Sequence, residues 1–222
     1  MKKFILLLLS FVIMLSIPVS AFAVAPELIE IPVSVDEKTT VTVVMPNELV
    51  KQFDVSEIEE LVESNDMNDG DVITILEVKD IIDPVQDVQP QFWGYKYKTT
   101  KTAGSEWKAQ NYFVISAAKG QTTTLSSKFS KTLTTSITAG NAFVKGDIGG
   151  SVTAEYSVSH QFVGPPESSS YNTREFRVQF YAKTVSFTQK KINSSNRVVA
   201  TRSGKAKAPT RYALYSIDRK IR

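Results

Sequence analysis

The chain has 222 residues, of which 42% are hydrophobic and 22% are charged, and its formal net charge is +3. It contains no cysteine, which excludes disulfides, thiol chemistry and lipid attachment through an N-terminal cysteine. The small net charge hides a strong asymmetry. Residues 24–90 hold seventeen acidic and three basic residues, a net charge of −14, whereas residues 91–222 hold six acidic and twenty-one basic residues, a net charge of +15.

The first 23 residues have the pattern of a secretory signal peptide. Lys2 and Lys3 precede an apolar segment over residues 4–17, and residues 21–23 (Ala-Phe-Ala) have the small-x-small pattern of a cleavage site. The apolar segment is about fourteen residues long, whereas a membrane-spanning helix needs ~20. We therefore expect cleavage after Ala23 and a secreted, extracellular protein, with cell-wall association as one possibility. A short lysine-led signal on a chain without cysteine is typical of a Gram-positive bacterium.

The pattern of residues 24–80 predicts a small acidic α+β region. The ranges 28–35, 39–45 and 72–78 are rich in β-branched residues and read as strands. We expect Asn47 to cap a short helix. A second helix is predicted over residues 56–64, with Ser56 and Glu59 as its capping box. Its buried face would hold Ile58, Leu61 and Val62. A loosely folded prosegment fits the same sequence.

Residues 81–90 contain two prolines among Asp and Gln, and the charge changes sign there, which predicts a linker. Residues 91–222 show little helical periodicity. They are rich in Ser, Thr, Val, Tyr and Phe, and glycine-containing turns recur. This pattern predicts a mainly β fold, in which a basic antiparallel β-sandwich or elongated β-sheet domain follows the acidic region.

The range 120–162 predicts a long amphipathic hairpin. Eleven of the eighteen residues from 121 to 138 are Ser or Thr, and Leu125, Phe129, Leu133 and Ile137 recur at every fourth position. Dense β-branched Thr opposes a helix, so we expect a strand with these residues on one face, together with Ser127, Lys131 and Thr135. Beyond the connecting segment, residues 148–162 alternate between apolar and polar, with Glu155 on the polar side. The segment between them has an apolar tip at Phe143 and Val144.

An eighteen-residue strand would extend ~59 Å, so it either bends and serves two sheets or forms a long ribbon. Such Ser/Thr-rich ribbons resemble the stems of aerolysin-like and epsilon-toxin/mosquitocidal-toxin-like β-pore-forming proteins, over about residues 120–162. The resemblance implies that the hairpin leaves a soluble monomer and joins a membrane barrel, with its apolar face toward lipid. It also implies a homo-oligomer. Lys131 would then face lipid, at a cost of about 2–4 kcal/mol at the membrane centre. Two half-buried strands of an ordinary sandwich are the alternative.

Basic residues cluster near the two ends of the predicted β domain. Outside a Gram-positive cell the available polyanions are cell-wall polymers and anionic lipid headgroups, and we expect this basic surface to bind them. Neutralisation by the acidic half of the same chain is the alternative, and nucleic acid is a poor partner for an exported protein. The expected surface-binding residues are Lys96, Lys98, Lys190, Lys191, Arg197, Arg202, Lys205, Lys207 and Arg211.

The sequence predicts no enzyme, no metal and no cofactor. His160 is the single histidine, and we expect it to be packed against its strand or exposed at the strand's end. Nucleophile–base pairs and zinc-ligand patterns are missing. Asp66, Asn68 and Glu77 have part of a calcium-loop spacing, but Gly70 falls at the fifth rather than the sixth position, which favours an acidic turn.

Three functions remain open from these patterns. The first is a secreted, non-enzymatic protein that binds an anionic cell-envelope or membrane surface, with the acidic region as an electrostatic cover or intramolecular partner. The second is a β-pore-forming, toxin-like protein that inserts the hairpin through Phe143 and Val144. The third is an inhibitor or immunity-type protein whose acidic region mimics a polyanion.

Overall fold

The computed structural model describes residues 26–36, 38–81 and 94–220. The predicted signal peptide and residues 82–90 of the predicted linker lie outside these residues. The described chain is mainly β, as predicted, and its strands form one large mixed sheet and two small two-stranded sheets. No helix in the described part of the chain is long and apolar enough to cross a bilayer.

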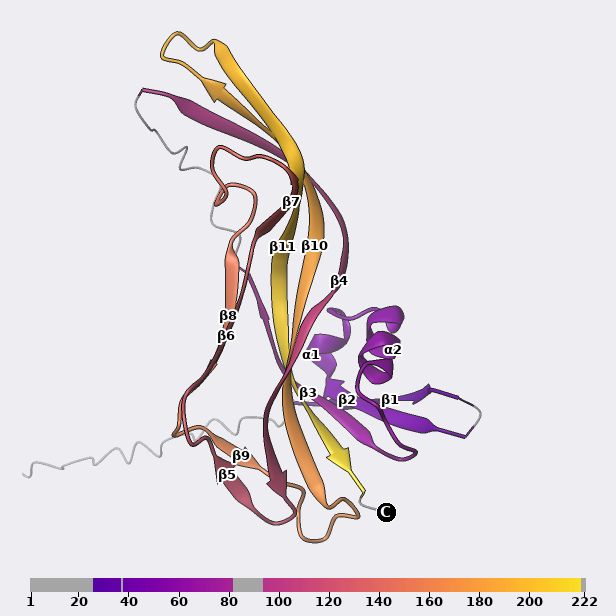
Figure 1. The fold of residues 1–222 in the computed structure, drawn as a ribbon. Coiled ribbons are helices and arrows are strands. Elements are labelled where there is room, and N and C mark those ends of the chain that lie inside the picture. Colours follow the sequence, from indigo (N-terminus) through magenta and orange to yellow (C-terminus); the bar gives the residue numbers. More distant parts are fainter. Residues whose placement is uncertain (1–25, 37, 82–93, 221–222) are drawn as a thin grey trace, which may run out of the picture.

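Three long antiparallel strands form the centre of the molecule (Figure 1). They are β4 (Lys96–Ala118), β10 (Thr173–Ile192) and β11 (Val198–Arg219), with β10 in the middle. Strands of 20 to 23 residues are several times longer than the usual five or six. Together they make an elongated, twisted sheet, hereafter the long sheet, along which all other elements are arranged.

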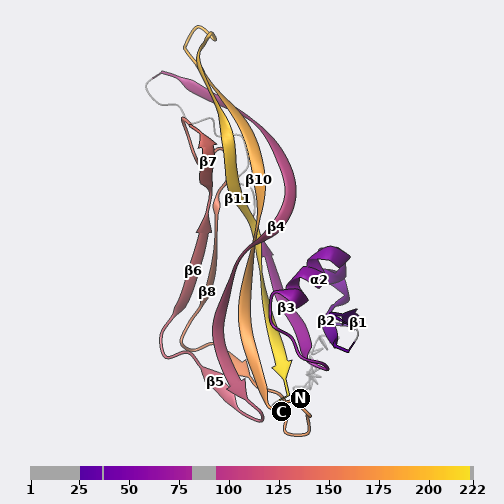
Figure 2. The same cartoon turned by 45° about the vertical axis from the view of Figure 1, so that its right-hand side comes forward.

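The pairing of the long strands is irregular at several places, and most of the shifts lie near the middle of the sheet. The register shifts after Phe180 and after Lys183 on the side of β4, and after Tyr181 on the side of β11. Pro209, which has no N–H to donate, lies at this level opposite Ala182. Bulges increase local twist, so they account for the way the strands cross over one another at mid-length in Figures 1 and 2.

The acidic region adds three short strands and two helices to one side of the long sheet. Its elements are β1 (Leu28–Ser34), β2 (Thr40–Pro46), α1 (Asn47–Val50), α2 (Val55–Glu63) and β3 (Val72–Asp80). Strand β2 pairs with β3 in parallel, and β3 pairs antiparallel with residues 211–218 of β11. The sheet therefore runs without a break from the acidic to the basic part of the sequence, in the order β1-β2-β3-β11-β10-β4.

The core of the acidic region is shared with the long sheet. Ile58, Leu61 and Val62 are buried, as predicted, and pack with Tyr181 and Tyr215 of the long strands. Both predicted N-caps are misplaced: that of α2 by two residues and that of α1 by one. The capping box of α2 is Asp54 with Glu57, since Asp54 accepts the N–H of Glu57 and Glu57 accepts that of Asp54. Pro46, not Asn47, occupies the N-cap of α1.

The predicted eighteen-residue strand is broken into three. Strand β5 (Thr122–Thr124) pairs with β9 (Gln161–Val163), β6 (Phe129–Thr134) pairs with β8 (Ser151–Tyr156), and β7 (Ser136–Gly140) joins the edge of β11. The uninterrupted long ribbon is wrong, and the alternative of a strand that bends to serve more than one sheet is nearer the structure, because the chain changes its pairing partner twice along this range. The range 121–163 still forms a hairpin, drawn beside the long sheet in Figures 1 and 2.

Candidate functional site

The two-stranded ribbon β6–β8 has one apolar and one polar face. Phe129 lies opposite Tyr156, and Leu133 lies opposite Val152, so their side chains share a face. That face packs on the long sheet against residues that include Phe180 and Tyr212. The other face is exposed to solvent and carries Ser130, Thr132, Thr134, Ser151, Thr153 and Glu155. The predicted alternation is confirmed in the ribbon.

Lys131 lies on the apolar side of the ribbon, as predicted. Its ammonium is 5.1 Å from the centre of the Tyr112 ring on β4. His160 follows the ribbon and is exposed, with its ring 4.6 Å from that of Phe162 and 5.1 Å from that of Tyr156. It therefore covers the end of the aromatic cluster.

Among the described strands of the hairpin, only β7 pairs with a strand of the long sheet. Ribbon β6–β8 and pair β5–β9 are separate two-stranded sheets, whereas β7 pairs with residues 204–207 of β11. The contact between β7 and β11 requires glycine on both strands. A Cβ at Gly140, which has φ of +77°, would lie 2.2 Å from the carbonyl oxygen of Ser203, and one at Gly204 would lie 2.2 Å from that of Ala139.

The loop 141–150 between β7 and β8 is folded back onto the long sheet. Ile148 is buried against Val185 and Phe187 of β10. The predicted tip residues, Phe143 and Val144, are half-buried rather than projecting into solvent. In the resting structure the tip is therefore a docked element.

Gln189 of β10 fixes the backbone of this tip. Its side chain is fully buried. Its Oε1 accepts the N–H groups of Phe143 (2.7 Å) and Val144 (3.2 Å), and its Nε2 donates to the carbonyl of Val144 (2.7 Å) and to Oγ1 of Thr99 (3.0 Å). A primary amide has two donors and two acceptor lone pairs, and all four are used here.

Two side chains hold the ring of Phe143. The Tyr97 ring lies 5.5 Å away, centre to centre, and the Arg202 guanidinium carbon is 4.2 Å from the centre of the Phe143 ring. Arg202 also donates from Nη1 to the carbonyl of Ala142 at 2.9 Å. Sequence reasoning missed Gln189 and Tyr97, because a polar residue within a strand and an aromatic residue among lysines carry no signal of what lies over them.

The long strands bring eight of the nine predicted surface-binding residues to one end of the sheet, hereafter the distal end (residues 96–102, 183–192 and 197–207). Antiparallel pairing places Lys96 opposite Ile192, Lys98 opposite Lys190, and Tyr97 opposite Lys191. Arg197 lies in the turn between β10 and β11, and Arg202, Lys205 and Lys207 follow it on β11. Among the ion pairs of the described residues, none involves any of these eight.

The two faces of the distal end differ. One face carries Val185, Phe187 and Gln189 and is covered by the loop 141–150. The opposite face is open, and three successive cross-strand rows on it hold only hydroxyl and ammonium groups: Lys98, Lys190 and Thr201; Thr100, Thr188 and Ser203; Thr102, Ser186 and Lys205. Like charges directly opposite each other, such as Lys98 and Lys190, are destabilising unless an anion lies between them.

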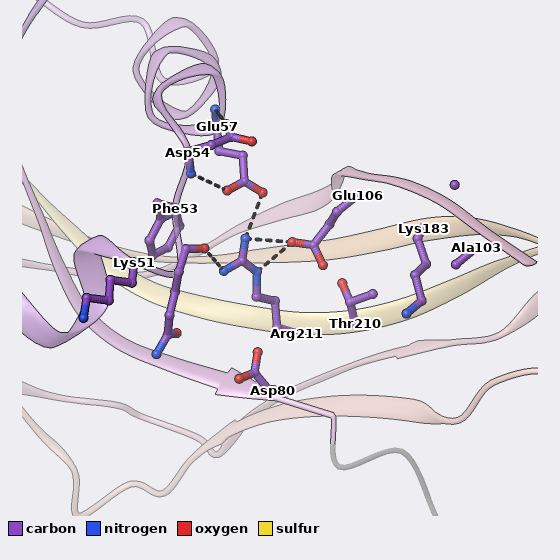
Figure 3. A pocket seen from close by; sticks show the side chains of 12 residues that line it. Lys51, Phe53, Asp54, Glu57, Asp80, Ala103, Glu106, Lys183, Thr210 and Arg211 are labelled. Atoms are coloured by element: carbon purple, nitrogen blue, oxygen red, sulfur yellow. Dashed lines mark hydrogen bonds and ion pairs between the residues drawn. The ribbon is translucent and has the colours of Figure 1, made fainter. Parts of the chain in front are cut away.

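Arg211 is the exception among the predicted surface residues, because its side chain is buried at the junction with the acidic region (Figure 3). Its Nη2 lies 2.8 Å from Oε1 of Glu57 and 2.7 Å from Oε2 of Glu106, and it also donates to the carbonyl of Gln52. The guanidinium lies within 5 Å of the rings of Phe53 (4.8 Å) and Tyr181 (4.7 Å). Arg211 therefore does not belong to the binding surface.

The electrostatics of this junction favour the charged form of Arg211. Burial opposes the charge, but the attraction of Glu106 and Glu57 outweighs it, and the pKa of Arg211 is raised. The junction borders an open cleft of about 650 Å³ that is also lined by Lys51, Asp80 and Lys183. Two other ion pairs cross from the acidic region to the long strands, Glu60 with Lys108 and Asp71 with Arg219. All three cations lie outside the distal end.

The residues of the partial calcium-loop spacing form a turn and a strand. Asp71 is fully buried, its Oδ2 accepts the N–H of Asn68, and it pairs with Arg219 at 3.1 Å.

Comparisons with protein-family models, with curated proteins and with solved structures found no match to this chain.

Proposed function

We propose that this is a secreted, non-enzymatic protein that binds an anionic membrane or cell-envelope surface through its distal end, and that the hairpin 121–163 then leaves the long sheet and inserts into lipid. One observation carries the proposal. The amphipathic ribbon β6–β8 is paired only with itself, and its apolar face is hidden against the long sheet. Releasing the ribbon breaks side-chain packing, and the ladder of backbone hydrogen bonds that the described hairpin must also give up is the short one between β7 and residues 204–207 of β11.

The two legs of the hairpin are long enough to cross a bilayer. Residues 129–140 and 151–163 give about a dozen residues a leg, and a transmembrane strand needs ~9–11 when tilted by ~45°. Both legs keep the alternation that such strands require. The apolar residues on the described strands of the two legs are Phe129, Leu133, Ile137, Ala139, Val152, Ala154, Tyr156, Phe162 and Val163, and of these Val163 alone lies on the polar side of the alternation.

The position of Lys131 is compatible with insertion. It precedes Gly140 by about nine residues, or ~30 Å of extended chain and ~21 Å along the membrane normal at a tilt of ~45°. The apolar band of a membrane barrel is ~25 Å tall, so with Gly140 at the far interface Lys131 comes close to the near one. The cost of a lysine there falls to about 0–1 kcal/mol.

Insertion requires several copies of the chain. A lone hairpin would expose unpaired strand edges to lipid, which the bilayer does not tolerate. The smallest membrane barrels have ~8 strands, so about four chains would each contribute two. A homo-oligomer is therefore part of this proposal.

A second candidate is a surface binder that never inserts. The docking of Phe143 and Val144 onto Gln189 favours it, because the tip is held in place in this structure. The open hydroxyl and ammonium face of the distal end supports anion binding in both candidates.

Dye release from vesicles separates the two. With equimolar phosphatidylglycerol and phosphatidylcholine, an inserting protein binds and releases the dye, whereas a binder only sediments with the vesicles. Phe143→Asp should abolish release without abolishing sedimentation, because a carboxylate would have to enter lipid. Asn141→Asp is the matched control, since it adds the same group to the same loop at an exposed polar position. Binding without release by the unmodified protein would reject insertion.

A further inference from the structure

We propose that Arg202 is a phosphate-binding trigger, and that Arg202 and Gln189 together form a latch that holds the loop 141–150 closed until an anionic phosphate group binds. The inference deepens the proposed function and rests on it for the insertion step that comes after opening. It names the residue through which surface binding would release the hairpin. The ligand chemistry is a phosphate oxyanion, whether it belongs to a lipid headgroup or to a soluble phosphate.

The closed state depends on one buried amide. All four hydrogen-bonding positions of Gln189 are used, three of them by the backbone of Phe143 and Val144. When the loop lifts, water can replace these partners, so the net difference between closed and open states is smaller than the gross strength of the bonds. A polar anchor of this kind suits a contact that must open.

Arg202 is the exposed half of the latch. It stacks on the ring of Phe143 at 4.2 Å and donates to the carbonyl of Ala142 at 2.9 Å. Its side chain is exposed, and it is in no ion pair among the described residues. A guanidinium whose contacts are a neutral carbonyl and an aromatic ring still has an uncompensated charge, and it therefore favours an anion as a partner.

A phosphate would compete directly with the loop for Arg202. The planar guanidinium matches two phosphate oxygens, and such charge-assisted hydrogen bonds are stronger than a bond to a neutral carbonyl. Capture of Arg202 by phosphate frees the carbonyl of Ala142 and removes the cation from Phe143. Lys98, Lys190 and Arg197 at the same end raise the local concentration of anions, so the exchange is favoured where the distal end meets an anionic surface.

The experiment measures hydrogen exchange at the backbone amides of Phe143 and Val144 in the full chain without its predicted signal peptide. Tripolyphosphate is the soluble probe, and equimolar phosphatidylglycerol and phosphatidylcholine vesicles are the lipid probe, each against sodium chloride of equal ionic strength. We expect either probe to raise exchange at these two amides by at least about tenfold. The amides of residues 173–182 of β10, outside the distal end, should stay protected.

Three variants test the assignment. Gln189→Leu should raise exchange at both amides without any phosphate. Arg202→Gln should remove the response to phosphate. Lys38→Gln, which removes an exposed cation of the acidic region outside the distal end, should retain it. The trigger is wrong if neither tripolyphosphate nor the vesicles change the exchange of the unmodified chain, or if Arg202→Gln responds as the unmodified chain does. Thermal melts confirm that the variants fold.

The outcome separates the latch from the proposed function. Opening by vesicles but not by tripolyphosphate assigns the phosphate to lipid. Opening without dye release rejects membrane insertion and leaves the latch standing. Dye release that is equal in the unmodified chain and in Arg202→Gln retains insertion and rejects the trigger.

Discussion

Replacing Arg211 with methionine should separate the contribution of charge from that of packing at the junction of the acidic region with the long sheet. Methionine retains an apolar chain between Phe53 and Tyr181 but removes the guanidinium that neutralises Glu57 and Glu106. The two carboxylates are then left close together without a counterion. The packing of the acidic region against the long sheet should therefore become less stable, since Glu57 lies on the first and Glu106 on the second.

The magnitude follows from how deeply the network is buried. The side chains of Arg211, Glu57 and Glu106 are only 8, 18 and 24% exposed. Removing one partner from such a network costs about 3–5 kcal/mol, because the remaining charges are left unpaired. Taking the lower value for these partly hydrated carboxylates, Arg211→Met should lose about 3 kcal/mol and, at this chain length, about 6–12 °C in Tm.

Equilibrium urea unfolding, followed by circular dichroism, measures this loss. The matched control is the triple variant Arg211→Met, Glu57→Gln, Glu106→Gln, which removes the isolated charges. It should recover to within about 1.5 kcal/mol of the unmodified chain, because replacing a whole buried ionic network is often nearly neutral. A loss below about 1 kcal/mol in Arg211→Met, or a triple variant no more stable than the single one, would refute the reasoning.

Three further changes have expected outcomes. Burial raises the pKa of the Tyr181 phenol above its ordinary value, so above about pH 10 the unfolded chain ionises before the folded one and the stability of the fold decreases. Tyr181→Phe should therefore unfold less readily in alkaline titration, and it should gain about 1 kcal/mol at neutral pH because it removes a buried hydroxyl without a partner. Hydrogen bonds from Ser56 and Glu57 lower the pKa of Asp54, so Asp54→Ala should reduce Tm at neutral pH, and the difference should vanish as the pH falls below about 3.9 and through the folded pKa. Gly140→Ala should speed hydrogen exchange in β7, because its Cβ would collide with the carbonyl of Ser203, whereas Gly146→Ala, with open space around it, should not.

Local patterns predicted the parts of the fold that depend on neighbouring residues. The alternation of residues 148–156 correctly gave the buried and exposed faces of β8, and the spacing of Ile58, Leu61 and Val62 gave the buried face of α2. The capping box was misplaced because Ser56 and Asp54 both precede a glutamate by three residues. The two candidates have the same spacing, and tertiary packing decides where the helix begins.

The pairing partners of the strands could not be predicted. Leu125, Phe129, Leu133 and Ile137 share a period, which says nothing about the changes of partner near Lys128 and Thr135. The three longest strands, β4, β10 and β11, are interrupted in sequence by Gly104, by charges and by Pro209. Long-range pairing across bulges overrides such local signals.

The candidate site was predicted in its charges but not in its geometry. Clustered lysines along β4, β10 and β11 indicated a basic surface, and antiparallel pairing does gather them at the distal end. The same criterion included Arg211, because the sequence does not show which cation faces two carboxylates across a buried junction. Gln189 went unnoticed, since one glutamine in a strand gains its role only from the loop that covers it.

The central claim, that the hairpin must leave the long sheet, is tested most directly by locking it in place. Ile137 of β7 lies directly opposite Ala206 of β11, and the chain has no cysteine of its own, so Ile137→Cys with Ala206→Cys provides a single disulfide. The control lock is Thr188→Cys with Ser203→Cys, which joins two strands that stay paired in the proposed mechanism. The measurement is dye release from phosphatidylglycerol-containing vesicles before and after reduction. We predict that the oxidised first lock binds vesicles without releasing dye and recovers on reduction, while the control lock releases dye in both states. Equal release by the fully oxidised first lock would contradict the mechanism.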